Sequence, residues 1–125
     1  MAADWLKNGH VAAMCFNDSA ALTCLSNDFG YESVFACPLV MHSKAGDLLF
    51  AISSSGRSNN IKFAISEAKL SDVNVITLSG FNPNNPLRRS GDVNFYVPSN
   101  KYGVVEICHL AILHHLLDRL INETR

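Results

Sequence analysis

Hydroxyl side chains cluster in the segment Phe50–Asn60, which reads FAISSSGRSNN. The hydroxyls belong to Ser53, Ser54, Ser55 and Ser58. No acidic residue lies between Asp47 and Glu67, and Gly56 would let the backbone approach a ligand closely. If a helix follows, its free N–H groups and the positive end of its dipole would favour a phosphate there. The alternative is a serine-rich cap on an ordinary helix. The segment is not a Walker loop, because GxxxxGK[ST] is absent.

Three ionisable side chains, Glu106, His109 and His114, interrupt an apolar segment with helical spacing near the C-terminus. With 3.6 residues per turn, His109 lies about 60° to one side of Glu106 and His114 about 80° to the other. His115 points to the opposite side. Because unpaired burial of such groups is costly, they either find partners across a subunit contact or serve a reaction. Histidine titrates near neutrality, as acid–base catalysis requires.

Apolar strands and helical segments alternate along the chain. We expect strands at residues 10–17, 47–53, 73–80 and 93–99. We expect helices at residues 18–30, 31–45 with an interruption at Pro38, 60–71 and 102–123. This order predicts an α/β fold, a three-layer α/β/α sandwich with a parallel sheet. Ligands of such folds bind beyond the carboxyl ends of the strands, which is where the serine segment falls.

Composition limits the classes of partner. The chain has 125 residues, 48% of them hydrophobic, and a formal net charge of -1, so we expect neither nucleic acid nor membrane as a partner. No apolar run approaches the roughly 20 residues of a membrane span, and no secretory signal is recognisable. The four cysteines form no CxxC pair. We interpret them as reduced core residues of a cytoplasmic protein.

Three segments resemble one known family. Residues 46–65, GDLLFAISSSGRSNNIKFAI, resemble the signature of the sugar isomerase (SIS) domain, in which a strand enters a serine-rich loop that grips a phosphosugar. Residues 22–35, LTCLSNDFGYESVF, and residues 94–118, NFYVPSNKYGVVEICHLAILHHLLD, resemble the phosphoheptose isomerase branch. The resemblance covers almost the whole chain. It implies a flavodoxin-like SIS fold, with residues 1–125 forming one partial domain.

The resemblance also implies roles for individual residues. It assigns the substrate phosphate to Ser53, Ser54, Ser55 and Ser58. Asp28 would belong to the sugar-binding site, although it could equally be a turn residue that bonds to nearby backbone N–H groups. His114 would be catalytic together with Glu106, and both positions bind zinc in some members. No nucleotide cofactor is implied.

The chain departs from the family at its start. Family members carry an N-terminal helix, a first strand with a GNGGS-type loop, and a helix that bears a histidine and a catalytic glutamate. None of these motifs occurs here, and MAADWLKNGH resembles the tail of that last helix. We therefore expect an N-terminally incomplete domain whose sheet exposes an edge. A truncated gene model, a fragment and a natural variant are all compatible with this pattern.

Two functions are compatible with these residues. The first is interconversion of sedoheptulose 7-phosphate and a heptose 7-phosphate, supplying lipopolysaccharide biosynthesis, by a cytoplasmic homo-oligomer that is a tetramer as in the family. The second is a non-catalytic SIS module that binds a phosphosugar or a protein partner, as a bacterial adaptor of the replication initiator does. Turnover of the sugar phosphate would distinguish them.

Overall fold

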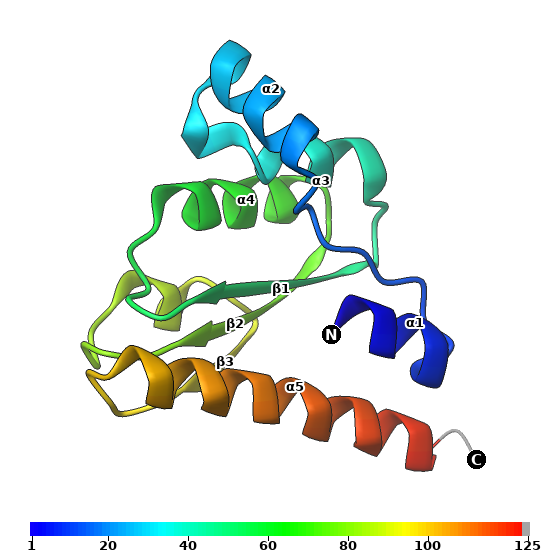
Figure 1. The fold of residues 1–125 in the computed structure, drawn as a ribbon, viewed down its shortest axis with the longest axis vertical. Coiled ribbons are helices and arrows are strands. Elements are labelled where there is room, and N and C mark those ends of the chain that lie inside the picture. The colour runs from blue at the N-terminus through cyan, green and yellow to red at the C-terminus, as the bar shows by residue number, and fades with distance from the viewer. Residues whose placement is uncertain (124–125) are drawn as a thin grey trace.

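A parallel sheet of three strands forms the centre of the protein in the computed structural model, which describes residues 1–123 (Figure 1). The strands are β1 (Leu48–Ser53), β2 (Asn74–Ser79) and β3 (Val93–Tyr96), in the order β1-β2-β3. Ser53 pairs with Ser79, and Ser79 pairs with Tyr96. The carboxyl ends of all three strands therefore meet at one edge of the sheet.

Helices lie on both faces of the sheet. The helices are α1 (Ala2–Gly9), α2 (Ser19–Phe29), α3 (Ala36–His42), α4 (Asn59–Leu70) and α5 (Tyr102–Glu123), with short 3-10 turns η1 (Tyr31–Ser33) and η2 (Pro86–Arg89). One layer contains α4 and α3, with α2 outside them, and the opposite layer contains α5 and α1 (Figure 1). The rings of Trp5 and Phe50, 5.4 Å apart, join α1 to β1. This arrangement confirms the predicted three-layer α/β/α fold.

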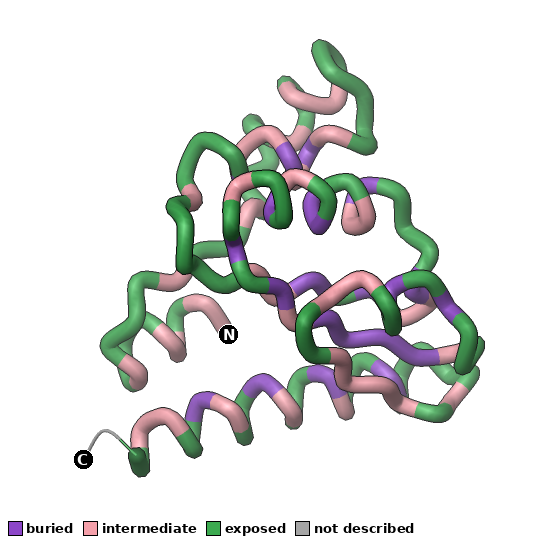
Figure 2. Tube along the Cα trace, turned by 180° about the vertical axis from the view of Figure 1, so that it is seen from behind, coloured by how far each residue is buried: buried purple, intermediate pink, exposed green. Residues whose placement is uncertain are grey.

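The main core lies between the sheet and the layer of α3 and α4. Its buried members are Leu39, Ala51, Ala64, Ile65, Ala68, Val73, Val75 and Leu87. In Figure 2 the buried residues concentrate in the strands and on the side of α4 that faces them. Removal of this apolar surface from water is the main term that stabilises such a fold. The carboxyl edge of the sheet is thus built on a packed base.

Most of the predicted elements are confirmed, and their local signals explain why. The side chain of Asp18 accepts a hydrogen bond from the N–H of Ala21 at 2.8 Å and so caps α2. Gly30, with φ of 83°, ends the same helix. The strands β1, β2 and β3 and the helices α4 and α5 lie within two to three residues of their expected bounds.

Three expectations were wrong. Residues 10–17 form no strand but an irregular, largely exposed segment after α1, since an apolar run becomes a strand only where a neighbouring strand offers backbone partners. Pro38 lies within the first turn of α3, where its missing N–H costs little, and the interruption falls before Ala36. The side chains of Cys15 and Cys24 are exposed rather than in the core, although all four cysteines are free as expected.

Helix α5 buries a single narrow stripe. The buried side chains are Val105, His109, Leu113 and Leu117, one per turn. The neighbouring apolar side chains of Val104, Ile107 and Leu110 are exposed, and Ile107 retains 70% of its accessible surface.

Within residues 1–123, no helix has the length and apolar character needed to cross a membrane.

Candidate functional site at the carboxyl edge of the sheet

A tight loop joins β1 to α4, and we call its residues, Ser53–Ser58, the serine loop. Ser53 ends β1, and α4 begins at Asn59, so the loop leads directly into the start of a helix. The backbone N–H of Gly56 donates to the carbonyl of Ser53 at 3.0 Å. Gly56 has φ of 65°, in the left-handed region that favours glycine. The predicted strand–loop–helix arrangement is therefore present.

The hydroxyl groups of the serine loop lie close together. The Oγ atoms of Ser53 and Ser58 are 3.1 Å apart, and the Oγ of Ser55 accepts a hydrogen bond from the N–H of Arg57 at 3.3 Å. Ser53 is buried, whereas Ser54 and Ser55 are partly exposed. Hydroxyls and the first N–H groups of α4 thus meet at one place, which is the arrangement that binds a phosphate group in other proteins.

A carboxylate from α5 reaches the serine loop. The hydroxyl of Ser54 donates to Oε1 of Glu106 across 3.5 Å, although the two residues are 52 positions apart. A second carboxylate, that of Glu32, accepts a hydrogen bond from Nδ2 of Asn59 at 2.8 Å, at the start of α4. The local sequence holds no acid, but the folded site is bordered by two. Their negative charge opposes an anion at the loop.

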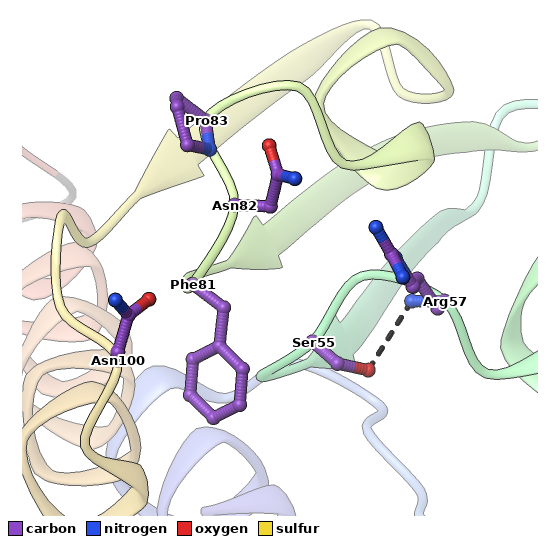
Figure 3. Close-up of a pocket in the computed structure, with 6 residues that line it drawn as sticks. All are labelled: Ser55, Arg57, Phe81, Asn82, Pro83 and Asn100. Carbon is purple, nitrogen blue, oxygen red and sulfur yellow. Dashed lines mark hydrogen bonds between the residues drawn. The ribbon is translucent and has the colours of Figure 1, made fainter.

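A pocket of about 480 Å³ opens beside the serine loop. It is lined by Ser55, Arg57, Phe81, Asn82, Pro83 and Asn100. Figure 3 shows that these residues come from the serine loop, from the loop after β2 and from the segment before α5. The lining combines a guanidinium, two amides and an aromatic ring. These groups can bind hydroxyl groups and an anion, so the pocket has room and chemistry for a sugar next to the serine loop.

Phe81 is held in an unusual backbone conformation at this pocket. Its φ is 59°, which costs a bulky residue of the order of 1–3 kcal/mol. Its N–H donates to the carbonyl of Ser99 at 2.9 Å, and its carbonyl accepts from the hydroxyl of Tyr96 at 2.8 Å. Its ring meets that of Tyr102 edge-on at 4.7 Å. The pocket wall is therefore formed before any ligand arrives.

His109 lies beneath the site rather than in it. Its side chain is 3% exposed, and its Nε2 lies 3.1 Å from the carbonyl oxygen of Ser79, to which it donates. Within residues 1–123, Nδ1 is buried without a hydrogen-bond partner. Burial lowers the pKa of His109 below its usual value of 6.5, outweighing the Ser79 hydrogen bond and the charge of Glu106. A neutral imidazole in this place joins α5 to β2.

The remaining predicted residues lie apart from the serine loop. His114 is exposed on α5, eight residues and about 12 Å of helix axis beyond Glu106. Asp28 is exposed in the last turn of α2, where its carboxylate accepts from Nδ2 of Asn27 at 2.8 Å. No hydrogen bond among residues 1–123 joins either residue to the loop. The structure thus brings together the four serines and Glu106 but leaves Asp28 and His114 outside this cluster.

Zinc requires three or four protein ligands around one point. Within the described part of the chain, no three His, Cys, Asp or Glu side chains are grouped to hold a metal ion. Glu106 and His114 are separated by two turns of the same helix, so this pair does not form such a site by itself. The described residues of this chain therefore do not by themselves form a zinc site. Zinc at Glu106 and His114 stays a prediction, and it would require further ligands from outside these residues.

Sequence reasoning missed the loop that follows β2. Phe81 and Asn82 line the pocket, and Asn85 is 1% exposed beneath it. The composition of this segment, FNPNNP, is that of a surface turn, so it carried no signal for burial. The predicted parallel sheet could have indicated this loop, because the loop after β2 must leave the sheet at the same edge as the serine loop.

Comparisons with known proteins agree with this geometry. Phosphoheptose isomerases of Photorhabdus laumondii and Klebsiella pneumoniae are 37% and 38% identical to this chain over 89% and 84% of its residues. Solved structures of phosphoheptose isomerases from Neisseria gonorrhoeae and Francisella tularensis superpose with TM-scores of 0.83 and 0.78 at 30% identity, over 93% and 86% of the chain. No protein-family model matches the chain. The chain spans 58% and 54% of the length of these two relatives, and 65% and 56% of the two solved chains.

Proposed function

We propose that the serine loop of this chain, which is similar to phosphoheptose isomerases over most of its length, binds the phosphate group of a sugar phosphate in an aldose–ketose isomerase site. The substrate pair is sedoheptulose 7-phosphate and a heptose 7-phosphate. One observation carries the proposal. The hydroxyls of Ser53 and Ser58 meet at 3.1 Å where α4 begins, beside a preformed pocket of sugar size.

The acid–base groups of the proposed reaction lie on α5. Isomerisation removes a proton from the carbon next to the carbonyl, forms an enediol, and returns a proton to the neighbouring carbon. Glu106 borders the loop through Ser54, so it can accept a hydrogen bond from a hydroxyl of the bound sugar. His114, two turns further along, serves the carbonyl end of the substrate, far from the phosphate. Its imidazole is exposed, so a ligand can reach it.

Calorimetry tests the binding step. Sedoheptulose 7-phosphate should bind much more tightly than sedoheptulose, because only the phosphate engages the serine loop. Ser55→Asp should abolish binding of the phosphate ester by placing like charge beside a dianion. Ser66→Asp on the exposed side of α4 is the matched control and should leave affinity unchanged. Equal affinity of the parent chain for the two sugars would refute phosphate recognition.

A non-catalytic module is the second candidate, and the position of His114 favours it. In this chain no hydrogen bond among the described residues links His114 to the cluster of the serine loop and Glu106. Binding of a phosphosugar or of a protein partner would need only the loop. Incubation with sedoheptulose 7-phosphate and detection of the aldose product distinguishes the candidates. Tight binding without product would support the module.

Further parts of the proposal come from the resemblance. They are a homo-oligomer, a tetramer as in the family, a cytoplasmic location, a product used for lipopolysaccharide, and participation of Asp28 in sugar binding. The exposed apolar side chains of α5 support the oligomer, since Val104, Ile107 and Leu110 would otherwise face water.

A further inference from the structure

The side chain of Asn85 lies buried beneath the candidate site and touches both of its walls. It is 1% exposed, although it comes from a loop of polar and proline residues. Buried amides are retained where they find partners, because an unpaired one is costly. The partners of Asn85 are therefore informative about what the side chain holds in place.

The amide nitrogen of Asn85 is bonded to the turn that forms the pocket wall. Nδ2 donates to the carbonyl of Asn82 at 2.9 Å, to the carbonyl of Gly80 at 3.0 Å and to Oγ of Ser79 at 3.3 Å. Two amide hydrogens are thus shared among three oxygens. On the other side, Oδ1 accepts from the N–H of Arg88 at 3.2 Å and caps η2. A flipped amide would place oxygen against oxygen, so the network defines its orientation.

The same side chain lies against the serine loop at Gly56. A methyl group added at Gly56 would come within 2.1 Å of Oδ1 and 2.4 Å of Cγ of Asn85. The backbone of the loop therefore rests directly on the Asn85 amide. Glycine is required here twice, by this contact and by its φ of 65°.

The backbone of Gly80 connects the two walls. Its N–H donates to the carbonyl of Ser54 in the serine loop at 2.9 Å. Its carbonyl accepts from Nδ2 of Asn85 at 3.0 Å. The backbone of one residue thus bonds to the loop through its N–H and to Asn85 through its carbonyl, and a network of this kind is held more rigidly than its separate bonds.

From these contacts we propose that Asn85 is a positioning residue that sets the conformation of the serine loop relative to the wall Gly80–Asn82. It touches no ligand. The inference that Asn85 affects ligand affinity rests on the proposed function, whereas the inference that it holds the serine loop in place does not. Removal of the Asn85 amide should loosen both walls and weaken phosphate binding, since the donors would no longer be held in place before binding.

Asn94 offers a matched control. Its Nδ2 donates to Oγ1 of Thr77 at 2.8 Å and to Oγ of Ser79 at 3.4 Å, so it is also an amide that satisfies oxygens of β2. None of the hydrogen bonds of its side chain reaches the serine loop or the Gly80–Asn82 wall within the described residues. Asn94→Ala and Asn85→Ala should both lower the melting temperature. Only Asn85→Ala should affect the site.

Hydrogen exchange tests the positioning role without a ligand. In Asn85→Ala the amides of Gly56 and Gly80, which donate to Ser53 and Ser54, should exchange faster by about tenfold or more relative to the amide of Val75 in β2. Asn94→Ala should leave that ratio unchanged. An unchanged ratio in Asn85→Ala would overturn the proposal.

Titration with inorganic phosphate tests the consequence for binding. Asn85→Ala should weaken phosphate affinity on the order of tenfold, with Asn94→Ala within twofold of the parent chain. If the parent chain binds neither phosphate nor sedoheptulose 7-phosphate, the proposed function fails, and hydrogen exchange still decides the role of Asn85. Parent-like affinity in Asn85→Ala would refute its effect on binding.

A double substitution tests the contact itself. Gly56→Ala should disrupt the loop by collision with Asn85, and Asn85→Ala removes the two nearest atoms. The effect of Gly56→Ala on loop exchange should therefore be smaller in the Asn85→Ala background, and additive effects would overturn the contact. Gly56→Ala alone also serves if Asn85→Ala fails to fold, because it perturbs the same contact from the loop side; an unchanged loop would then refute the proposal.

Discussion

The imidazole of His109 donates from Nε2 to the carbonyl of Ser79 at 3.1 Å and joins the N-terminal half of α5 to the carboxyl end of β2. Ser79 is fully buried, and its hydroxyl also accepts from Asn85. One residue at the strand end therefore links the helix that carries Glu106 to the loop that supports the pocket. The candidate site is held together from below by neutral hydrogen bonds.

The stability of the fold should depend on pH through His109. Burial lowers the pKa of His109 in the folded chain, so between that value and about 6.5 the unfolded chain binds more protons. The contribution of the neutral His109 to the free energy of unfolding is complete above pH 6.5. It is lost as the pH falls below 6.5, by up to about 1.4 kcal/mol per pH unit. Urea unfolding of His109→Gln between pH 5 and 7.5 should give a flatter profile than the parent chain. His115→Gln on the exposed side of α5 is the control, and equal slopes for the parent and His109→Gln would contradict this role.

Glu106→Gln should strengthen the binding of inorganic phosphate. The substitution removes a negative charge 3.5 Å from the hydroxyl of Ser54 while keeping an acceptor for that hydroxyl. We expect roughly a three- to tenfold gain in affinity at low ionic strength, decreasing as salt screens the charge. Glu123→Gln, at the other end of α5, should change nothing. Weaker phosphate binding in Glu106→Gln would show that the carboxylate assists the ligand instead.

His114→Ala should remove turnover and spare phosphate affinity. Loss of an acid–base group typically lowers the rate by about 10²–10⁴-fold. His115→Ala, about 100° away around the helix, should reduce the rate only slightly. The measurement is the initial rate with sedoheptulose 7-phosphate, paired with calorimetry on the same variants. Loss of activity in His115→Ala alone would show that both the helix phase and the assigned role are wrong.

Ile107→Lys should dissociate the proposed homo-oligomer. Ile107 is 70% exposed beside Val104 and Leu110, and a charge there would oppose burial in a subunit contact. Sedimentation at micromolar concentration should show an oligomer for the parent chain and a smaller species for the variant. Leu70→Lys is the control, because Leu70 is 79% exposed at the end of α4, on the opposite layer. A well-folded monomeric parent chain would contradict the oligomer.

Local signals accounted for most of the fold. The apolar run of β1, the caps Asp18 and Gly30 of α2, and the helical spacing of α4 each act over a few residues, so they can be recognised without tertiary contacts. Residues 10–17 carried a strand-like pattern but formed no strand. Hydrophobic spacing cannot tell whether a neighbouring strand will be available.

The sequence by itself determined the serine loop, because a strand that ends in hydroxyls before a helix places them at the carboxyl edge of a parallel sheet in any arrangement of the rest. Only the tertiary structure decided that Glu106 reaches Ser54 and that Asn85 is buried under Gly56. These relationships depend on how α5 and the loop after β2 pack against the sheet. That packing is set by long-range contacts, such as Val105 against Gly80 and His109 against Ser79, which no spacing along the chain encodes.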